Sequence, residues 1–197
     1  MSRVAIILGS TRTPSIGPTI AGLISAAITP LLPAGATLRT INLKDHPLPP
    51  YLTGGPPAAL NPGEYSDPQT NSWSKVINDL DAFIFCTPQH NWSVPASLKL
   101  ALDAIFKEWN GKPAMVVSYG GRGGSKANDH LRQICVGLHM NVCERSVELA
   151  FGGSGHKPAS GEVEPELMER WTAEEKKTEL IQACEALVEM LKPPSDA

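Results

Sequence analysis

Short apolar runs that alternate with longer helical stretches are the feature of this sequence that most limits its fold. Runs of strand length stand at residues 4–8, 82–87 and 114–118, and nearly every side chain in them is apolar. Such unbroken runs are typical of strands buried on both faces of a sheet. The segments 37–43 and 141–150 are predicted to complete a set of five strands.

Between these strands, apolar residues recur at the spacing of an amphipathic helix. Five helices are predicted, in the regions 16–31, 72–80, 93–109, 125–138 and 172–191. Thr172 and Glu175 have the spacing of a capping box, so we expect them to start the last helix.

The third predicted helix carries an apolar stripe that is wider than a helix needs to cover a sheet. Leu98 starts the apolar face, and its wide part consists of Leu102, Ile105, Phe106 and Trp109. We therefore expect this helix to pack on the same helix of a second copy, which predicts a homodimer.

The alternation of strands and helices predicts one α/β domain over residues 1–197, a three-layer sandwich with helices on both faces of a parallel sheet. Right-handed crossovers and a single reversal of direction give the strand order 2-1-3-4-5. Two long loops are expected outside this frame. The segment 47–67 is rich in Pro and Gly and is either a lid or a linker, and the second loop covers 152–165.

Composition excludes several classes of function. The net charge is −3 with both signs interspersed, which argues against a nucleic-acid partner. No stretch approaches the ~20 apolar residues that cross a bilayer, and we expect no signal peptide and no membrane partner. The four cysteines are scattered without metal-ligand spacing, so we expect no metal and a cytoplasmic location.

In a sheet of this order, ligands bind beyond the carboxyl ends of the strands. The loop after the first strand, residues 9–17, contains Ser10, Thr11, Arg12 and Ser15 directly before a helix. Hydroxyls, a guanidinium and the amides of a helix N-terminus suit a phosphate, although an ordinary capped turn would look similar. The loop lacks the glycine pattern of a dinucleotide site and the ending of a P-loop, so a mononucleotide suits it better.

Two further loops have the same character. Residues 87–95 contain Gln89, His90 and Asn91, whose amides and ring nitrogens can read the edge of a heterocycle, and Trp92, which could pack on a ring or at a subunit contact. Residues 118–125 contain four glycines, which let a backbone approach a flat ligand closely. Each loop has a structural explanation by itself, but three of them at three neighbouring strand ends indicate a ligand site.

These loops resemble those of the NADPH-dependent FMN reductase family, and most closely those of its fungal quinone reductases. The resemblance rests on residues 9–12, 87–92, 117–121 and 109–114, and it extends from Val4 to about Val147. It implies a flavodoxin-like fold, bound FMN, NADPH or NADH as reductant, and a homodimer or a tetramer.

The resemblance also implies which residues hold the cofactor. The phosphate would contact Ser10, Arg12, Ser15, Ile16 and Gly17. The ribityl chain and isoalloxazine would contact Pro88, Gln89, His90 and Asn91. The pyrimidine or dimethylbenzene side of the flavin would contact Ser118, Tyr119, Gly120 and Gly121. His90 stands where the family most often has Tyr. A titratable ring at this position could shift the redox potential or help to protonate a product.

The implied activity is a ping-pong transfer of hydride from NAD(P)H to FMN, followed by two-electron reduction of a small acceptor. Quinones, azo compounds, flavins and metal ions are all candidate acceptors, and no catalytic residue is named because the cofactor carries the chemistry. The alternatives are a flavodoxin-type electron carrier and a flavoprotein whose redox state controls the binding of a protein partner.

Overall fold

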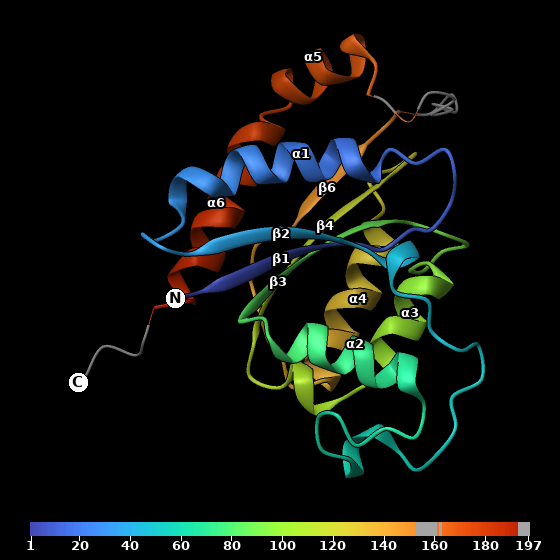
Figure 1. Cartoon of the computed structure of the whole chain (residues 1–197). Coiled ribbons are helices and arrows are strands. Elements are labelled where there is room, and N and C mark those ends of the chain that lie inside the picture. Colours follow the sequence, from blue (N-terminus) through green and yellow to red (C-terminus); the bar gives the residue numbers. More distant parts are fainter. Residues whose placement is uncertain (153–160, 162, 193–197) are drawn as a thin grey trace.

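The strands form one parallel sheet at the centre of the molecule (Figure 1). The computed structural model describes residues 1–152, 161 and 163–192. The strands are β1 (Arg3–Leu8), β2 (Thr37–Asn42), β3 (Ala82–Pro88), β4 (Pro113–Gly120), β5 (Asn141–Val142) and β6 (Val147–Ala150). Their order is β2-β1-β3-β4-β5, with β6 also paired to β4, which confirms the predicted order.

The predicted fifth strand is divided into two pieces. Val142 is aligned with Ala114 near the start of β4, and Val147 is aligned with Val117 farther along the same strand. Glu144 and Arg145 lie between the pieces in a segment that is not extended. Polar residues of this kind cannot continue a buried strand, and the edge of the sheet is therefore interrupted.

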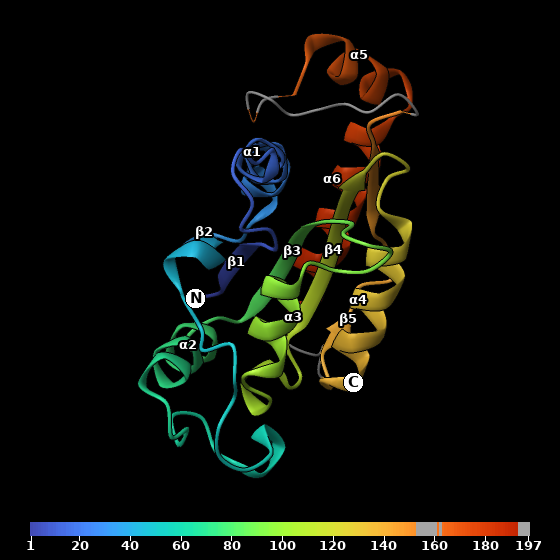
Figure 2. The same ribbon diagram turned by 90° about the vertical axis from the view of Figure 1, so that its right-hand side faces the viewer.

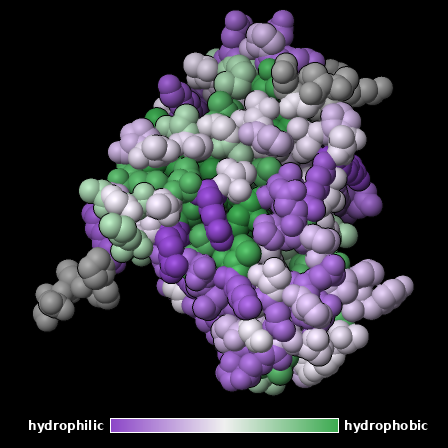
Figure 3. Space-filling model, in the orientation of Figure 1, coloured by the Kyte–Doolittle hydropathy of each residue, from purple (hydrophilic) through white to green (hydrophobic). Residues whose placement is uncertain are grey.

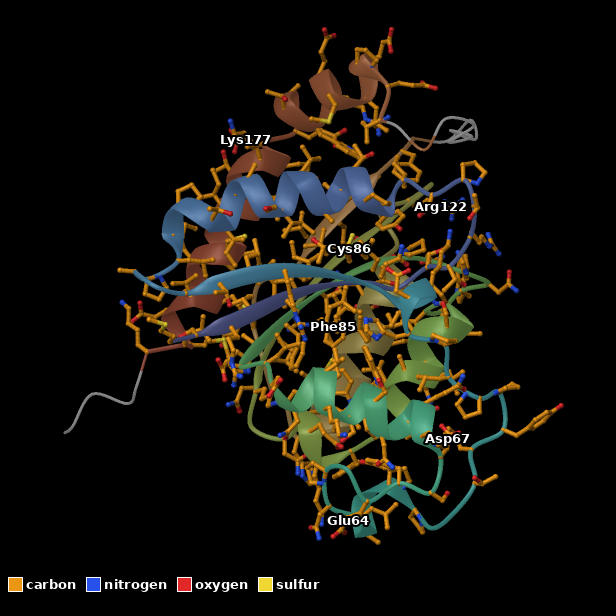
Figure 4. The ribbon with its side chains drawn as sticks, viewed as in Figure 1. Glu64, Asp67, Phe85, Cys86, Arg122 and Lys177 are labelled. Atoms are coloured by element: carbon orange, nitrogen blue, oxygen red, sulfur yellow. The ribbon has the colours of Figure 1, made fainter. Side chains whose placement is uncertain are left out.

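In the described part of the chain, six α-helices cover the sheet, one more than predicted. They are α1 (Gly17–Ile28), α2 (Pro68–Asn78), α3 (Ala96–Asp103), α4 (Ser125–Gly137), α5 (Pro165–Ala173) and α6 (Lys176–Glu189). Helices α1, α5 and α6 pack on one face and α2, α3 and α4 on the other (Figures 1 and 2). Side chains alternate between these layers, as the neighbours Phe85 and Cys86 show in Figure 4.

The last predicted helix, over 172–191, corresponds to α6, while α5 before it was not predicted, and the expected capping box is wrong. Glu175 has a φ of 56°, a left-handed conformation that separates α5 from α6. The Thr172 hydroxyl donates to the Met168 carbonyl at 2.9 Å, within α5, so it caps no helix start. The loop expected over 152–165 lies largely outside the described residues.

The third helix is also shorter than predicted. It ends at Asp103, and a 3-10 turn at Lys107–Trp109 follows. Leu102, Ile105 and Trp109 are fully buried in the core of this same chain. The wide stripe therefore forms no surface for a second copy, and the homodimer has no support from it.

The Pro- and Gly-rich segment packs on the layer of α2 (Figure 1). Helix α2 begins at Pro68, where the Asp67 carboxylate accepts from the Thr70 amide at 2.7 Å, four residues before the expected start. Just before this cap, the Tyr65 hydroxyl donates to buried Glu108 at 3.0 Å. These contacts tie the end of the segment to the molecule.

The edge strand β2 is the least buried of the longer strands, as its mixed pattern predicted. Figure 3 shows apolar side chains across the middle of this face, at the level of β2, with hydrophilic side chains above and below. Among the described residues, no helix has the length and apolar character that crossing a membrane requires. The described histidines, cysteines and acidic residues form no cluster of three or more suited to a metal ion.

Candidate flavin site

The three predicted ligand loops meet at the carboxyl edge of the sheet, on the right of Figure 1. The Ser97 hydroxyl at the start of α3 donates to the Gly9 carbonyl at 2.8 Å. The Gln89 amide donates to the Tyr119 carbonyl at 3.1 Å, and the Gln89 side-chain oxygen accepts from the Lys126 amide at 3.0 Å. The loop after β3 is thus joined to the loops after β1 and β4.

The loop before α1 has the donors that a phosphate requires. Helix α1 begins at Gly17, its cap residue Ile16 makes no side-chain hydrogen bond, and Pro18 at its second position has no amide hydrogen to donate. The Ser15 hydroxyl oxygen accepts from the Gly17 amide at 3.2 Å, and that of Ser10 accepts from the Arg12 amide at 3.3 Å. Both hydroxyl groups keep a hydrogen to donate to an anion.

The steric and electrostatic surroundings of this loop fit a phosphate as well. A Cβ atom at Gly9 would stand 2.9 Å from the Thr87 hydroxyl oxygen, so only glycine lets the two loops approach this closely. Segment 9–17 contains no acidic residue. The positive end of the α1 dipole and the Arg12 guanidinium therefore attract an anion without an opposing charge in the loop.

The loop after β3 ends in a tight turn. The His90 amide donates to the Ser93 carbonyl and the Ser93 amide to the His90 carbonyl, both at 2.9 Å. Between them, Asn91 and Trp92 have φ values of 45° and 71°. Partial burial lowers the pKa of His90, and the nearby charge of Arg12 lowers that pKa further. Because this pKa is lowered from the ordinary value of 6.5, the His90 ring is mainly neutral at pH 7.

Gln89 connects the loops through its side chain. Its oxygen accepts from the backbone at the start of α4, which leaves the Nε2 amide to donate to a ligand. The sequence predicts that the whole Gln89 amide is available to hydrogen-bond a heterocycle. The structure shows that its oxygen instead caps the start of α4.

Ser118 and Tyr119 have side chains that are occupied inside the protein. The fully buried Ser118 hydroxyl donates to the Gly123 carbonyl at 2.8 Å and accepts from the Asn128 amide at 3.3 Å. The Tyr119 ring is 3% exposed, and burial raises the pKa of its hydroxyl. Only the backbone of these two residues is left for the flavin contact predicted for them.

Three further residues shape the site and were missed from the sequence. Gly124 has a φ of 80°, and a Cβ atom there would lie 2.9 Å from the Tyr119 carbonyl oxygen. Asn128 and Ser97 hold the glycine loop and the phosphate loop through the hydrogen bonds described above. The run of glycines was a signal for Gly124, but no sequence pattern links Ser97 to Gly9 across 88 residues.

A parallel sheet of this order, with a loop rich in hydroxyls after β1 and two more polar or glycine-rich loops at the same edge, defines the flavodoxin-like class of fold. The chain matches the family of NADPH-dependent FMN reductases over residues 2–153, and it belongs to that family. The predicted class of enzyme, an NAD(P)H-dependent FMN oxidoreductase, is confirmed at the level of the family.

Individual relatives agree with this assignment. An NAD(P)H-dependent FMN reductase of Saccharomyces cerevisiae is 42% identical over 146 residues, which cover 71% of this chain and 76% of the relative. A quinone reductase of Pseudomonas putida is 32% identical over 161 residues, 77% of this chain and 78% of the relative. An oxidoreductase structure from Corynebacterium diphtheriae has a TM-score of 0.67 at 20% identity, with 97% of each chain covered, and it shows the fold alone.

Proposed function

We propose that this protein uses tightly bound FMN to reduce quinones and related small acceptors at the expense of NAD(P)H. The observation that supports the proposal is the meeting of the three loops at one edge of the sheet, where Gln89 contacts Tyr119 and Lys126. Relatives named as quinone reductases favour quinones among the candidate acceptors.

The residues present fit FMN. Ser10, Arg12 and Ser15, at the positive end of the α1 dipole, would hold the phosphate. The segments 88–91 and 118–121 would hold the ribityl chain and the ring, the latter through its backbone. Bound FMN supplies a ring that takes a hydride from NAD(P)H and passes two electrons on, chemistry that no side chain provides.

The solvent supplies the protons that balance the overall reaction. NAD(P)H and one proton give NAD(P)⁺ and two reducing equivalents, and a quinone takes up two electrons and two protons to become a hydroquinone. The chain orients the reactants, and the two substrates use the same open edge in turn. Because the pKa of His90 is lowered, this side chain offers a neutral hydrogen-bonding group at pH 7 rather than a cation.

The absorbance spectrum of the purified protein tests this proposal. Flavin bands near ~450 nm should be present and should bleach on anaerobic addition of NADPH or NADH, because hydride arrival removes the conjugation of the oxidised ring. The colour should return when a quinone is added. A protein that binds FMN but is not bleached by either nucleotide would be an electron carrier, and a colourless protein that rejects FMN would refute the proposal.

We also propose that the protein acts as a homodimer or tetramer in the cytoplasm. The resemblance to the family supports the assembly, and static light scattering measures it directly. All four cysteines are buried free thiols, which supports a reducing compartment. A monomer at micromolar concentration would contradict the first proposal, and microscopy of the tagged full-length protein tests the second.

A further inference from the structure

Trp92 is an exposed aromatic residue at the edge of the sheet where the three loops meet. Its relative exposure is 61%. It lies two residues after His90, in the loop that extends past the carboxyl end of β3 (Figure 1). Neither the phosphate loop nor the core uses its indole, so its role is not explained by the site described above.

The backbone at Trp92 is unfavourable for any residue with a side chain. A two-residue turn in which both φ values are positive strongly prefers glycine at its second position, where Trp92 stands with a φ of 71°. An L-residue in this region is disfavoured because its Cβ crowds the following carbonyl oxygen. Glycine would form the same turn at a lower conformational free energy. Strain of this kind persists mainly where a side chain has a function.

The turn that carries Trp92 is held on both sides. Two hydrogen bonds of 2.9 Å close it between His90 and Ser93. The Ser93 hydroxyl is 3.0 Å from Nδ1 of His130 on α4, and Gln89 caps the same helix. The backbone therefore presents the indole from a defined position. A held aromatic ring loses little conformational entropy when it binds another ring.

The surroundings of Trp92 favour a small planar ligand over a protein surface. The residues on either side of it in the turn, Asn91 and Ser93, are polar, and the Ser93 hydroxyl is bonded to His130. The core of a subunit interface is more apolar than this. A single aromatic face amid hydrogen-bonding groups suits a flat molecule whose edge is polar, and a quinone is such a molecule.

We propose that Trp92 is a specificity-determining residue, an aromatic platform on which the ring of the electron acceptor packs. The proposal rests on the reductase function proposed above and deepens it. It assigns the acceptor class as flat, fused-ring quinones, because the area that an indole face can cover grows with the number of rings in the ligand.

The test compares the FMN-loaded wild type with Trp92→Gly and Trp92→Phe. The ratio of kcat/KM for 1,4-naphthoquinone to that for 1,4-benzoquinone is measured for each protein. Trp92→Gly should lower this ratio about 5- to 10-fold, through KM for naphthoquinone, and Trp92→Phe should recover most of it. The rate at which NADPH bleaches the flavin is measured in parallel, since the indole is assigned to the acceptor alone.

Two control variants separate this effect from strain and from apolar exposure. Glu175 has a similar φ of 56° far from this edge, so Glu175→Gly should relieve strain and leave the quinone ratio unchanged. Val136 is 63% exposed on α4, and Val136→Ala should also leave the ratio unchanged. Trp92→Gly and Glu175→Gly should both raise Tm by about 2–4 °C.

The outcomes are distinct. An unchanged quinone ratio in Trp92→Gly would overturn the proposal. So would a shift of Trp92→Gly to a smaller assembly in light scattering without a change in the ratio, because the indole would then be a subunit contact. If NADPH fails to bleach the wild-type flavin, the proposed function itself fails, and this is seen before any variant is compared.

Discussion

At the scale of single residues, the carboxyl edge of the sheet contains two kinds of position. Gly9 and Gly124 shape the backbone, because a Cβ atom at either would come within 3 Å of a neighbouring oxygen. Ser10, Arg12 and His90 instead offer atoms to a ligand. Substitutions at the first kind of position are tested by measuring the stability of the protein. Substitutions at the second kind are tested by measuring ligand binding and pH dependence.

Replacing Gly124 with alanine should destabilise the protein and distort the glycine loop. The new Cβ would be forced against the Tyr119 backbone at a φ of 80°, so we expect a loss of about 2–3 kcal/mol in the free energy of unfolding. Gly22→Ala is the matched control. Gly22 is exposed in α1 with no atom near its Cβ position, so the same change should stabilise by about 0.5–1 kcal/mol. Chemical denaturation measures both.

His90 should make the flavin-free protein less stable in acid. Its pKa is lowered in the folded state from the ordinary value of 6.5, so the unfolded chain takes up a proton first as the pH falls. Stability that is fully present above pH 6.5 is therefore lost progressively below it, and His90→Gln should make this loss shallower. Denaturation at several pH values between 5 and 8 measures the slope.

The same residue should affect the pH profile of quinone reduction. We expect His90→Tyr to change the acid limb of this profile, because it removes the titratable ring near the proposed cofactor. His46 is the control, since burial also lowers its pKa while its ring contacts Trp73 on the α2 side. His46→Gln should change stability in acid but not the kinetic profile, and an unchanged profile in His90→Tyr would remove His90 from the reaction.

At the scale of elements, unbroken apolar runs were sufficient to predict β1, β3 and β4, because a strand buried on both faces needs apolar side chains at every position. The break between α5 and α6 was not predictable in the same way. Residues 172–175 have the pattern of a helix start, but the hydroxyl of Thr172 turns back to Met168. Whether a short polar stretch starts or ends a helix is decided by how the flanking helices pack on the sheet.

Glu108 should anchor the end of the Pro- and Gly-rich segment to the turn after α3. It is 1% exposed and accepts hydrogen bonds from the hydroxyls of Tyr65 and Ser74. Glu108→Ala would leave two donors without partners, so we expect a loss of about 2–4 kcal/mol, and Tyr65→Phe should lose less.

Glu64, at the outer end of the same segment in Figure 4, provides the comparison. It is exposed and its carboxylate accepts from the neighbouring Asn61, so Glu64→Ala should change stability by less than about 0.5 kcal/mol. Denaturation curves of the three variants rank the contacts, and equal losses for Glu108→Ala and Glu64→Ala would contradict the anchor.

At the scale of the whole molecule, the fold brings residues from distant parts of the chain to one edge. The proposed phosphate loop follows β1, while the segments that would contact the flavin ring follow β3 and β4, whose order places them beside β1. A ligand that spans these loops should therefore stabilise the entire domain, since it binds only when all of them are in place.

FMN should raise the thermal stability of flavin-free protein more than riboflavin does. Ligand at about 100 times its Kd adds about 2.7 kcal/mol, or a rise in Tm of about 5–10 °C for a chain of this length. Riboflavin lacks the phosphate, so at equal concentration its effect should be smaller. Arg12→Ala should reduce the FMN shift and leave the riboflavin shift unchanged. Equal losses with both ligands would place Arg12 away from the phosphate.

The sequence by itself determined the layers of this protein, the strand order and the three loops of the candidate site, because periodicity and loop chemistry are local properties of a chain. Only the tertiary structure decided how these parts are used. The stripe at Leu102, Ile105 and Trp109 is buried in its own core, and the side chains of Ser118 and Tyr119 are buried inside the protein. The physical reason is that burial and hydrogen-bond partners depend on residues far apart in the chain, as the contact of Ser97 with Gly9 shows.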